Sequence, residues 1–450
     1  MGRVALMGEN SVEYVSALLD IWNNNDCVVL LDWRIPIQTA IQMMHEADVK
    51  VCYIDEKLVD KSMVVNTKDI SFVIYKVSDT CPRLLPNEIL KKYHKSYSFN
   101  EAVIIYSSGT TGKSKGIILS HFAITTNADS IIDYMKPDLG DCIYTVRPLS
   151  HSSTITGELL VALISRCKYL LSPTVVPPRY ILRNVDNFNV TILCLNPTML
   201  SMLIDEYRRG KSSIIPLRTI YVSGSILNDS TYSKAHEIFN NLNIYNVYGL
   251  SEAAPRVTAQ REDCCKSNSV GKPIKGISVV IVDESGHILK NGHEGIVHVN
   301  TPSKYIGYVY GEEKHRSLYK GWLNTGDIGY IDANEELHII SRIDDVIIIY
   351  GHKIYPNEVV SQILKFVNID ECVVTSVSFG GEDVLCCLYS APLRLCDDIK
   401  AKLGKVLMRY EIPRIFIRTN ELPKTRTGKI SIRLSKEILI REIEMTRLHE

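Results

Sequence analysis

A run of serine, threonine, glycine and lysine residues has the composition of a phosphate-binding loop. It follows the apolar segment 102–106, which reads as a buried strand, and precedes the apolar residues 117–119. The run consists of Ser107, Ser108, Gly109, Thr110, Thr111, Gly112, Lys113, Ser114, Lys115 and Gly116. Glycines let backbone N–H groups approach phosphate oxygens without a Cβ clash, hydroxyls donate hydrogen bonds, and lysines neutralise charge. We therefore predict a phosphate contact here, in preference to an ordinary polar surface turn.

This loop differs from the Walker A motif, although Gly112, Lys113 and Ser114 match part of it. Five positions before Gly112 stands Ser107, where a Walker loop has glycine. A strand is expected after Ser114, where a Walker loop opens a helix. The sequence thus predicts a different class of phosphate site.

The elements around the loop predict an α/β fold. Residues 3–7 and 28–32 read as strands, and Asn10 with Glu13 is a candidate cap for the helix between them. Strand and helix patterns recur over residues 191–207 and 219–248, as expected for a parallel sheet with crossover helices. A helix is also expected from Thr156.

The pattern of apolar and polar residues changes from Gly271 onward. Residues 277–283, 294–300 and 336–340 alternate in hydrophobicity between turn residues and predict a small antiparallel β unit. The rest reads as an α+β domain with helices at 357–366 and 398–408 and strands at 372–377, 384–389 and 415–418. We therefore predict a large domain over residues 1–341 and a small mobile domain over residues 342–450.

Composition excludes several classes of protein. The 450 residues carry 51 basic and 51 acidic side chains, so the net charge is zero and no basic footprint for nucleic acid is expected. The 12 cysteines include no C-x-x-C pair, and no apolar run approaches the roughly 20 residues of a membrane helix. A reducing, cytoplasmic location and a small-molecule partner are expected, with no membrane span.

Five ordered blocks make the sequence resemble the adenylate-forming superfamily, which includes acyl-CoA and aryl-CoA synthetases and the adenylation domains of peptide synthetases. They are the loop at 107–116, the adenine and magnesium motif at 246–252, the ribose motif at 321–327, the hinge and thioester loop at 341–345 and 351–353, and the catalytic-lysine loop at 423–429. The resemblance covers nearly the whole chain. It implies a fold with a large α/β domain and a small mobile domain, and an enzyme that uses ATP and Mg²⁺ to join a carboxylic acid to AMP.

The resemblance assigns roles to the nucleotide-side residues. Asn246 and Tyr248 are expected at adenine, with Gly249 beside them, because Tyr248 has a flat face and Asn246 can donate and accept at the base edge. Ser251 is expected at the α-phosphate. Glu252 supplies the hard oxygen that Mg²⁺ prefers. Asp327 is expected at the ribose, because its two carboxylate oxygens suit the two ribose hydroxyls. Arg342 is expected at the ribose or a phosphate.

The last quarter of the chain is expected to move. Lys429 matches the lysine that neutralises the acid and the α-phosphate in the transition state. Asp344 matches the hinge, and Gly351 matches the loop that then approaches the pantetheine channel. One active site would in this way serve two half-reactions.

The acid and the acceptor are less sharply defined. His151 matches a block near the substrate carboxylate, and small residues at the expected pocket floor, Ser223, Gly224, Val247 and Gly249, admit a flat ring or a chain end. Residues 150–156 contain no carboxylate for an α-ammonium group, so an aryl or fatty acid is favoured over an amino acid. The acceptor thiol belongs to coenzyme A, which is favoured, or to the phosphopantetheine arm of a carrier protein.

Several positions depart from the family pattern. Ser114 replaces proline, Ser251 replaces threonine, Ser341 replaces glycine and Lys353 replaces arginine, and all four changes keep the required chemistry. The chain also opens almost directly on the strand that family members reach after a further segment, so either it is naturally short or its translation start is internal. The non-enzymatic alternative is an inactive relative that binds nucleotide as a sensor or scaffold. The joint presence of Glu252, Asp327, Arg342 and Lys429 favours the enzyme.

Overall fold

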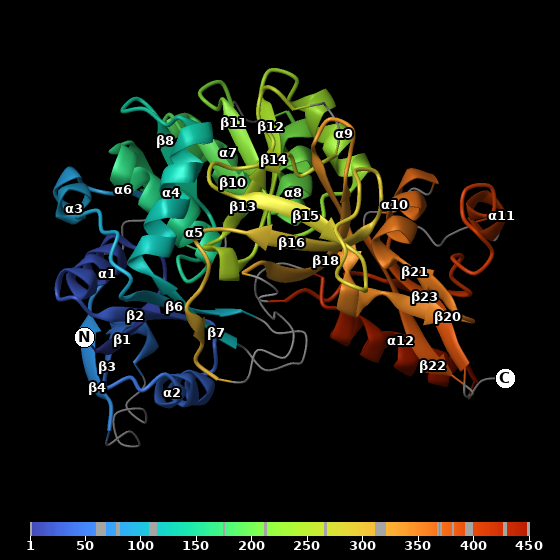
Figure 1. Ribbon diagram of the computed structural model, residues 1–450, viewed down its shortest axis with the longest axis horizontal. Coiled ribbons are helices and arrows are strands. Elements are labelled where there is room, and N and C mark those ends of the chain that lie inside the picture. The colour runs from blue at the N-terminus through green and yellow to red at the C-terminus, as the bar shows by residue number, and fades with distance from the viewer. Residues whose placement is uncertain are drawn as a thin grey trace.

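The computed structural model of the protein describes residues 2–59, 69–77, 82–107, 115–173, 176–210, 214–264, 268–310, 321–366, 369, 371–379, 382–391, 399–425 and 430–447. Figure 1 shows the sheet that contains the amino-terminal strands at one end of the molecule and the carboxyl-terminal elements at the other. Two further sheets lie between them. The two chain ends therefore lie far apart.

The first sheet is mostly parallel and has the strand order β17-β7-β6-β2-β1-β3-β4. Its strands are β1 (Arg3–Gly8), β2 (Cys27–Asp32), β3 (Val51–Asp55), β4 (Ser71–Tyr75), β6 (Glu101–Ser107), β7 (Lys115–Ser120) and β17 (Gly307–Tyr308). Its helices are α1 (Val12–Asn23), α2 (Ile37–Glu46), α3 (Asn87–Lys92) and α4 (His121–Met135), with the short turn η1 (Glu56–Leu58). Leu6 packs with α1 and α4, whereas its neighbours Ala5 and Met7 pack with α2 on the other face.

The second sheet has the order β14-β13-β12-β11-β10-β8-β9-β5. Its strands are β5 (Arg83–Leu84), β8 (Cys142–Thr145), β9 (Lys168–Leu171), β10 (Ile192–Leu195), β11 (Thr219–Val222), β12 (Asn243–Gly249), β13 (Arg256–Ala259) and β14 (Lys272–Pro273). Its helices are α5 (Ser152–Thr154), the π-helix η2 (Ile155–Leu160), α6 (Val161–Ser165), α7 (Pro178–Asn187), α8 (Pro197–Arg208), α9 (Asp229–Ile238) and the turn η3 (Ser251–Ala253). One face packs on α7, α8 and α9 and the other on α4 and η2.

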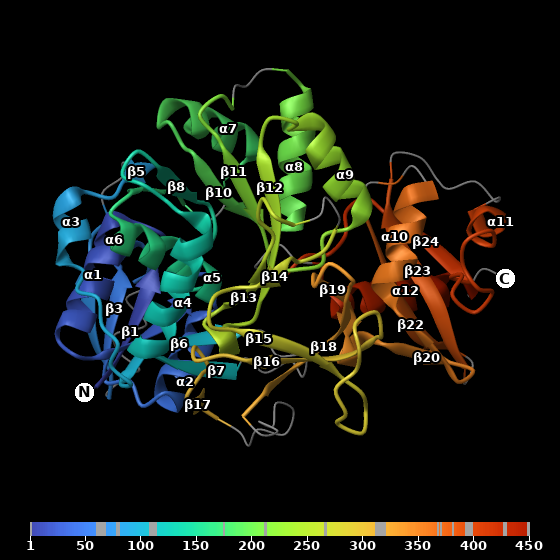
Figure 2. The same ribbon diagram turned by 45° about the horizontal axis from the view of Figure 1, so that its top comes forward.

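An antiparallel sheet and the carboxyl-terminal elements complete the fold. The sheet contains β15 (Ser278–Val282), β16 (Gly295–Asn300), β18 (Leu323–Ile331) and β19 (Leu337–Arg342). The later elements are η4 (Ile343–Asp345), β20 (Ile347–Ile349), β21 (His352–Ile354), α10 (Pro356–Phe366), β22 (Glu371–Phe379), β23 (Glu382–Ser390), α11 (Ile399–Leu403), β24 (Ile415–Thr419) and α12 (Ile432–Arg447). Figure 2 shows α10 beside α9 and β19, between the central sheets and the carboxyl-terminal end of the molecule.

The structure confirms the α/β prediction and the antiparallel β unit. β19 runs through Arg342, and the domain boundary between residues 341 and 342 stays a prediction.

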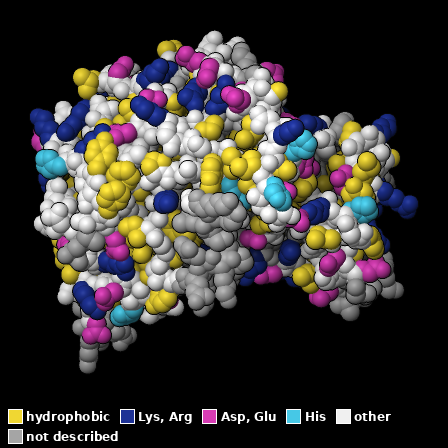
Figure 3. All heavy atoms as spheres, viewed as in Figure 1, with side chains coloured by type: hydrophobic (Ala, Val, Ile, Leu, Met, Phe, Trp, Pro, Cys, Tyr) yellow, Lys and Arg dark blue, Asp and Glu magenta, His cyan; other side chains and the backbone are white. Residues whose placement is uncertain are grey.

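On the face shown in Figure 3, basic and acidic side chains are interspersed over both the body and the smaller carboxyl-terminal lobe. Within the described part of the chain, a helix with the length and hydropathy needed to cross a bilayer is absent.

Three local predictions need correction. Ser11, and not Asn10, caps α1, because its side chain accepts a hydrogen bond from the Tyr14 N–H at 3.0 Å. The buried Asn10 amide instead donates to the Arg147 carbonyl and accepts from the Leu149 N–H, far along the chain. The helix expected from Thr156 already begins at Ser152, and the helix expected at residues 398–408 is confined to α11 within the described residues.

Candidate functional site

The carboxyl ends of neighbouring parallel strands bring many of the predicted residues together. β8, β10, β11 and β12 pair in parallel, so their ends meet at one edge of the sheet. His151 lies after β8, Ser223 and Gly224 follow β11, and β12 ends with Asn246, Val247, Tyr248 and Gly249. This edge is where open α/β sheets bind ligands.

Three residues assigned to the nucleotide are in direct contact. Arg342 Nη1 lies 3.0 Å from Asp327 Oδ1, and the Tyr248 hydroxyl donates a hydrogen bond to Oδ2 of the same carboxylate. Asp327 and Arg342 face each other on β18 and β19, whereas Tyr248 comes from β12. The tertiary fold thus joins the adenine, ribose and hinge motifs at one carboxylate.

The protonation of Tyr248 follows from its burial beside Asp327. Asp327 is only 4% exposed. Burial and the negative charge of Asp327 raise the pKa of Tyr248 well above its usual range, so its hydroxyl remains a donor at neutral pH. A carboxylate offers about four acceptor sites, and the two hydroxyls of a ribose fit this chemistry.

Asn246 and Gly249 shape the end of β12. The buried Asn246 amide donates to the Ser269 carbonyl at 3.0 Å and to Asn268 Oδ1 at 3.3 Å, so both of its donor hydrogens are used inside the protein. A Cβ at Gly249 would lie 2.0 Å from the Pro255 carbonyl oxygen, so only glycine fits. The role of Asn246 at the adenine edge stays a prediction, with Oδ1 as the atom that could serve it.

Glu252 is linked to the strand that leaves the phosphate loop. Its Oε1 accepts a hydrogen bond from the Tyr308 hydroxyl at 2.9 Å, and its side chain is nearly buried. The ring of Tyr308 also lies 5.7 Å from the Lys115 ammonium. The pairing of β17 with β7 brings Tyr308 here, and because residues 303–310 carry no motif, sequence reasoning missed it.

The donor set around Glu252 fits Mg²⁺ better than a metal held in a protein cage. No group of three or more His, Cys, Asp or Glu side chains in the described part of the chain is arranged to hold a metal ion. Magnesium is typically bound by one or two carboxylates together with phosphate oxygens and water. A single carboxylate such as Glu252 fits this mode of binding, and its role at Mg²⁺ stays a prediction.

Ser251 and His151 are connected through a residue that the sequence did not single out. The hydroxyls of Ser251 and Ser152 lie 2.9 Å apart, and Ser152 is the first residue of α5. His151 is the N-cap of α5, but its side chain makes no hydrogen bond to the helix end. The motif assigned to the α-phosphate thus lies beside the block assigned to the acid.

The phosphate loop joins two antiparallel strands. Ser107 ends β6 and pairs with Lys115, which begins β7, so the loop is a hairpin connection followed by a strand. This geometry supports the rejection of a Walker A loop. Ser108, Gly109, Thr110, Thr111 and Gly112 lie outside the described residues, as does Lys429, so their roles stay predictions.

The hinge residues lie on the surface. Asp344 is exposed within η4, and Gly351 has φ +81° in the turn between β20 and β21. Beside this turn, Lys353 Nζ lies 2.7 Å from Glu284 Oε1 in the antiparallel β unit. Movement about Asp344 stays a prediction.

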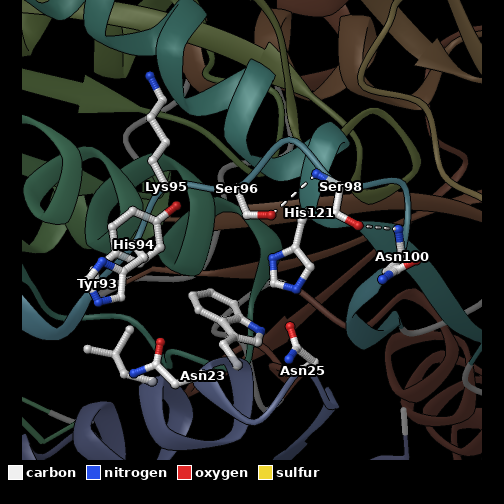
Figure 4. Close-up of a pocket in the computed structure, with 11 residues that line it drawn as sticks. Asn23, Asn25, Tyr93, His94, Lys95, Ser96, Ser98, Asn100 and His121 are labelled. Carbon is white, nitrogen blue, oxygen red and sulfur yellow. Dashed lines mark hydrogen bonds between the residues drawn. The ribbon is translucent and has the colours of Figure 1, made fainter.

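A pocket of about 270 Å³ lies apart from these residues. It is formed by the end of α1, the segment after α3 and the start of α4, with Trp22, Tyr93, Lys95 and His121 in its wall (Figure 4). Burial lowers the pKa of His121. None of the predicted site residues lines this pocket, so it is not the proposed active site.

Comparison with known proteins gives a consistent family. The family model described as AMP-binding enzyme matches residues 2–309. A 2-succinylbenzoate–CoA ligase of Enterococcus faecalis is 25% identical over 446 residues, which cover 95% of this chain and 87% of that protein. The fatty acid–[acyl-carrier-protein] ligase ScoC of Streptomyces coeruleorubidus is 23% identical, with 95% and 85% covered.

A solved structure supports the fold. The O-succinylbenzoate coenzyme A synthetase MenE of Bacillus subtilis, in complex with ATP and magnesium ion, superposes with a TM-score of 0.80 at 20% identity. The match covers 95% of this chain and 88% of that one. The large and small domains of such enzymes therefore have counterparts in the present fold.

Proposed function

The chain belongs to the AMP-binding enzyme family, and from this premise we propose that it is an AMP-forming acid–thiol ligase. It activates a carboxylic acid with ATP, releases pyrophosphate and passes the acyl group to a pantetheine thiol. The observation that carries the proposal is the joint contact of Tyr248, Arg342 and Asp327, three residues from separate motifs. A nucleotide-binding role explains why they meet at one buried carboxylate.

In the proposed first step, a carboxylate oxygen of the acid attacks the α-phosphorus of ATP, and the bond to pyrophosphate breaks. Catalysis of this step depends mainly on positioning and charge neutralisation. Asp327 holds the ribose, and Ser251 donates to the α-phosphate. Mg²⁺, when bound at Glu252, neutralises phosphate charge. Lys429 is proposed to neutralise both reactants as the new bond forms.

The second step transfers the acyl group from AMP to sulfur. We propose coenzyme A as the principal acceptor and the phosphopantetheine of a carrier protein as the alternative, which the ScoC relative supports. The proposed small domain, residues 342–450, turns about Asp344 and brings Gly351 toward the thiol. The exposure of both residues is compatible with this movement.

The acid is proposed to enter beside His151. Ser223, Gly224, Val247 and Gly249 form the proposed floor, and an aryl or fatty acid fits these small residues. The names of the relatives support a broad acid class, since one acts on 2-succinylbenzoate and another on fatty acids.

Exchange of labelled pyrophosphate into ATP tests the proposal. Benzoates, fatty acids and amino acids are compared side by side, and exchange is expected with one acid class. Lys429→Ala should lower this exchange about tenfold or more, because a preorganised charge is removed. Lys405→Ala, which alters an exposed lysine of the same small domain, serves as the control and should retain exchange.

Each contrary result has a separate meaning. Unchanged exchange in Lys429→Ala would remove the role of Lys429. Nucleotide binding without exchange for any acid would instead favour the sensor or scaffold alternative.

A further inference from the structure

A buried cluster of charged side chains adjoins the proposed acid pocket. The Arg147 guanidinium donates from Nε and Nη2 to Oε1 of Glu158, with the Nε bond at 3.2 Å. Its third nitrogen, Nη1, donates to the Ser223 hydroxyl at 3.0 Å. Arg147 is 8% exposed and Glu158 is fully buried. The cluster therefore reaches the pocket floor through Ser223.

A second arginine lies against the same helix. A Cβ placed on Gly157 would be 3.5 Å from Arg256 Nη2, and Arg256 is 3% exposed. The Asn127 amide holds the Arg256 backbone through two hydrogen bonds of 2.9 Å. Two cations and one carboxylate are thus gathered in the protein interior.

The helix that carries Glu158 has unusual geometry. Gly157 and Glu158 belong to η2, a π-helix that interrupts the run from α5 to α6. Such π-helical turns are rare and occur frequently at functional sites. Within η2, Glu158 accepts the hydrogen bonds from Arg147, and Gly157 lies next to the Arg256 guanidinium.

The charges of the cluster do not balance. Two guanidinium groups and one carboxylate leave one net positive charge in a buried region, where an uncompensated charge is costly. Burial works to lower the pKa of Arg147, but Glu158 beside it raises that pKa above its usual value, so the guanidinium stays charged. Arg256 Nε and Glu158 Oε2 have no hydrogen-bond partner among the described residues.

The geometry at Ser223 is suited to an anion. Nη1 of Arg147 carries two hydrogens, and the Ser223 hydroxyl that accepts one of them still has its own proton to donate. A guanidinium N–H and a hydroxyl O–H at one point form a pair of donors for a carboxylate.

We propose that the acid substrate is a dicarboxylic acid, whose second carboxylate binds at Arg147 and Ser223. The reacting carboxylate lies at the other end of the molecule, beside His151. The second carboxylate balances the positive charge of the cluster. This inference rests on the proposed function and adds a substrate class to it, with Arg147 as the specificity-determining residue.

Matched pairs of acids test the inference. Pyrophosphate exchange is measured with butanoate against succinate and with hexanoate against adipate, as kcat/KM. The dicarboxylate of at least one pair should be favoured about 30-fold, the order expected for hydrogen bonds to a charged group. Arg147→Gln should bring that ratio close to one, because the guanidinium that would bind the second carboxylate is removed.

The chain offers a matched control. Arg218 makes two hydrogen bonds to Asp141, of 2.8 and 2.7 Å, just before the start of β11, whereas Ser223 follows its end. Arg218→Gln therefore breaks a similar arginine–carboxylate pair at the opposite edge of the sheet. It should leave the ratio between the acids unchanged.

Three results would overturn the inference. They are a preference for the monocarboxylate in both pairs, an unchanged ratio in Arg147→Gln, and a changed ratio in Arg218→Gln. If Arg147→Gln does not fold, Ser223→Ala supplies the same comparison, because it removes one donor and keeps the ion pair; an unaltered ratio in that variant also overturns the inference. Absence of exchange with every acid would contradict the proposed function itself, whereas exchange with monocarboxylates only would contradict the dicarboxylate alone.

Discussion

The nucleotide side and the acid side of the proposed site carry buried charges of opposite sign, and different partners surround these charges. On the nucleotide side, Asp327 and Glu252 each accept a hydrogen bond from a tyrosine hydroxyl, from Tyr248 and Tyr308 respectively. On the acid side, two buried arginines lie about a single buried glutamate. The nucleotide side presents carboxylates that accept from tyrosine hydroxyls, with Arg342 also paired to Asp327, and the acid side presents excess positive charge.

This difference suggests a division of labour between the two sides. A tyrosine hydroxyl orients a carboxylate without cancelling its charge, which suits Glu252 to a cation, whereas Asp327 is also paired with Arg342 and its oxygens suit sugar hydroxyls. A partly compensated guanidinium favours an anionic group. Changes on the nucleotide side should therefore affect all acids equally, whereas changes on the acid side should affect the choice of acid.

The largest effect is expected for Asp327→Ala. Loss of this carboxylate removes the proposed ribose contact and leaves the Arg342 guanidinium without its partner, so pyrophosphate exchange should fall about 100-fold or more. The fall should be the same for every acid. Asp332→Ala is the control, because Asp332 lies in the turn after β18 and pairs with His338 at 3.1 Å. If Asp327→Ala changed the ratio of exchange rates between two acids as much as it lowers the exchange rate itself, the proposed separation of the nucleotide side from the acid side would be contradicted.

A smaller effect is expected for Tyr308→Phe. The substitution removes one hydrogen bond to Glu252, worth about 1 kcal/mol, and should raise the Mg²⁺ concentration for half-maximal exchange about fivefold. Titration of exchange against Mg²⁺ measures this shift. Tyr180→Phe, at a residue 43% exposed on α7, should leave the titration unchanged. An unaltered Mg²⁺ requirement in Tyr308→Phe would show that the hydroxyl does not steer Glu252.

The smallest effect concerns stability in alkali. The pKa of Tyr248 is raised in the folded protein, so its contribution is present below the unfolded tyrosine pKa of about 10 and is lost as pH rises beyond it. The free energy of unfolding should fall above pH 10, at most about 1.4 kcal/mol per pH unit for this one group. Denaturant titrations between pH 8 and pH 11 should give a shallower fall for Tyr248→Phe. If the free energy of unfolding fell equally steeply with pH in the unaltered protein and in Tyr248→Phe, the Tyr248 hydroxyl would not belong to the buried cluster.

Sequence reasoning succeeded where adjacent residues carry the chemistry. Glu252 and Tyr248 stand in one contiguous block, and Asp327 follows a recognisable Gly-Trp turn, so their residue types alone suggested the family. It failed where the partner is distant. Tyr308 reaches Glu252 only through the pairing of β17 with β7. Asn10 looked like a helix cap, but its amide is engaged by the backbone after β8.

The sequence by itself determined the family, the α/β class and the order of the motifs, because local periodicity and contiguous residue types do not depend on long-range contacts. Only the tertiary structure decided which motif residues touch. It placed Tyr248 and Arg342 on one carboxylate, and it enclosed Arg147, Glu158 and Arg256 in one interior. The physical reason is that burial and proximity create the charge balance of a site, and both arise only when strands from distant parts of the chain are paired.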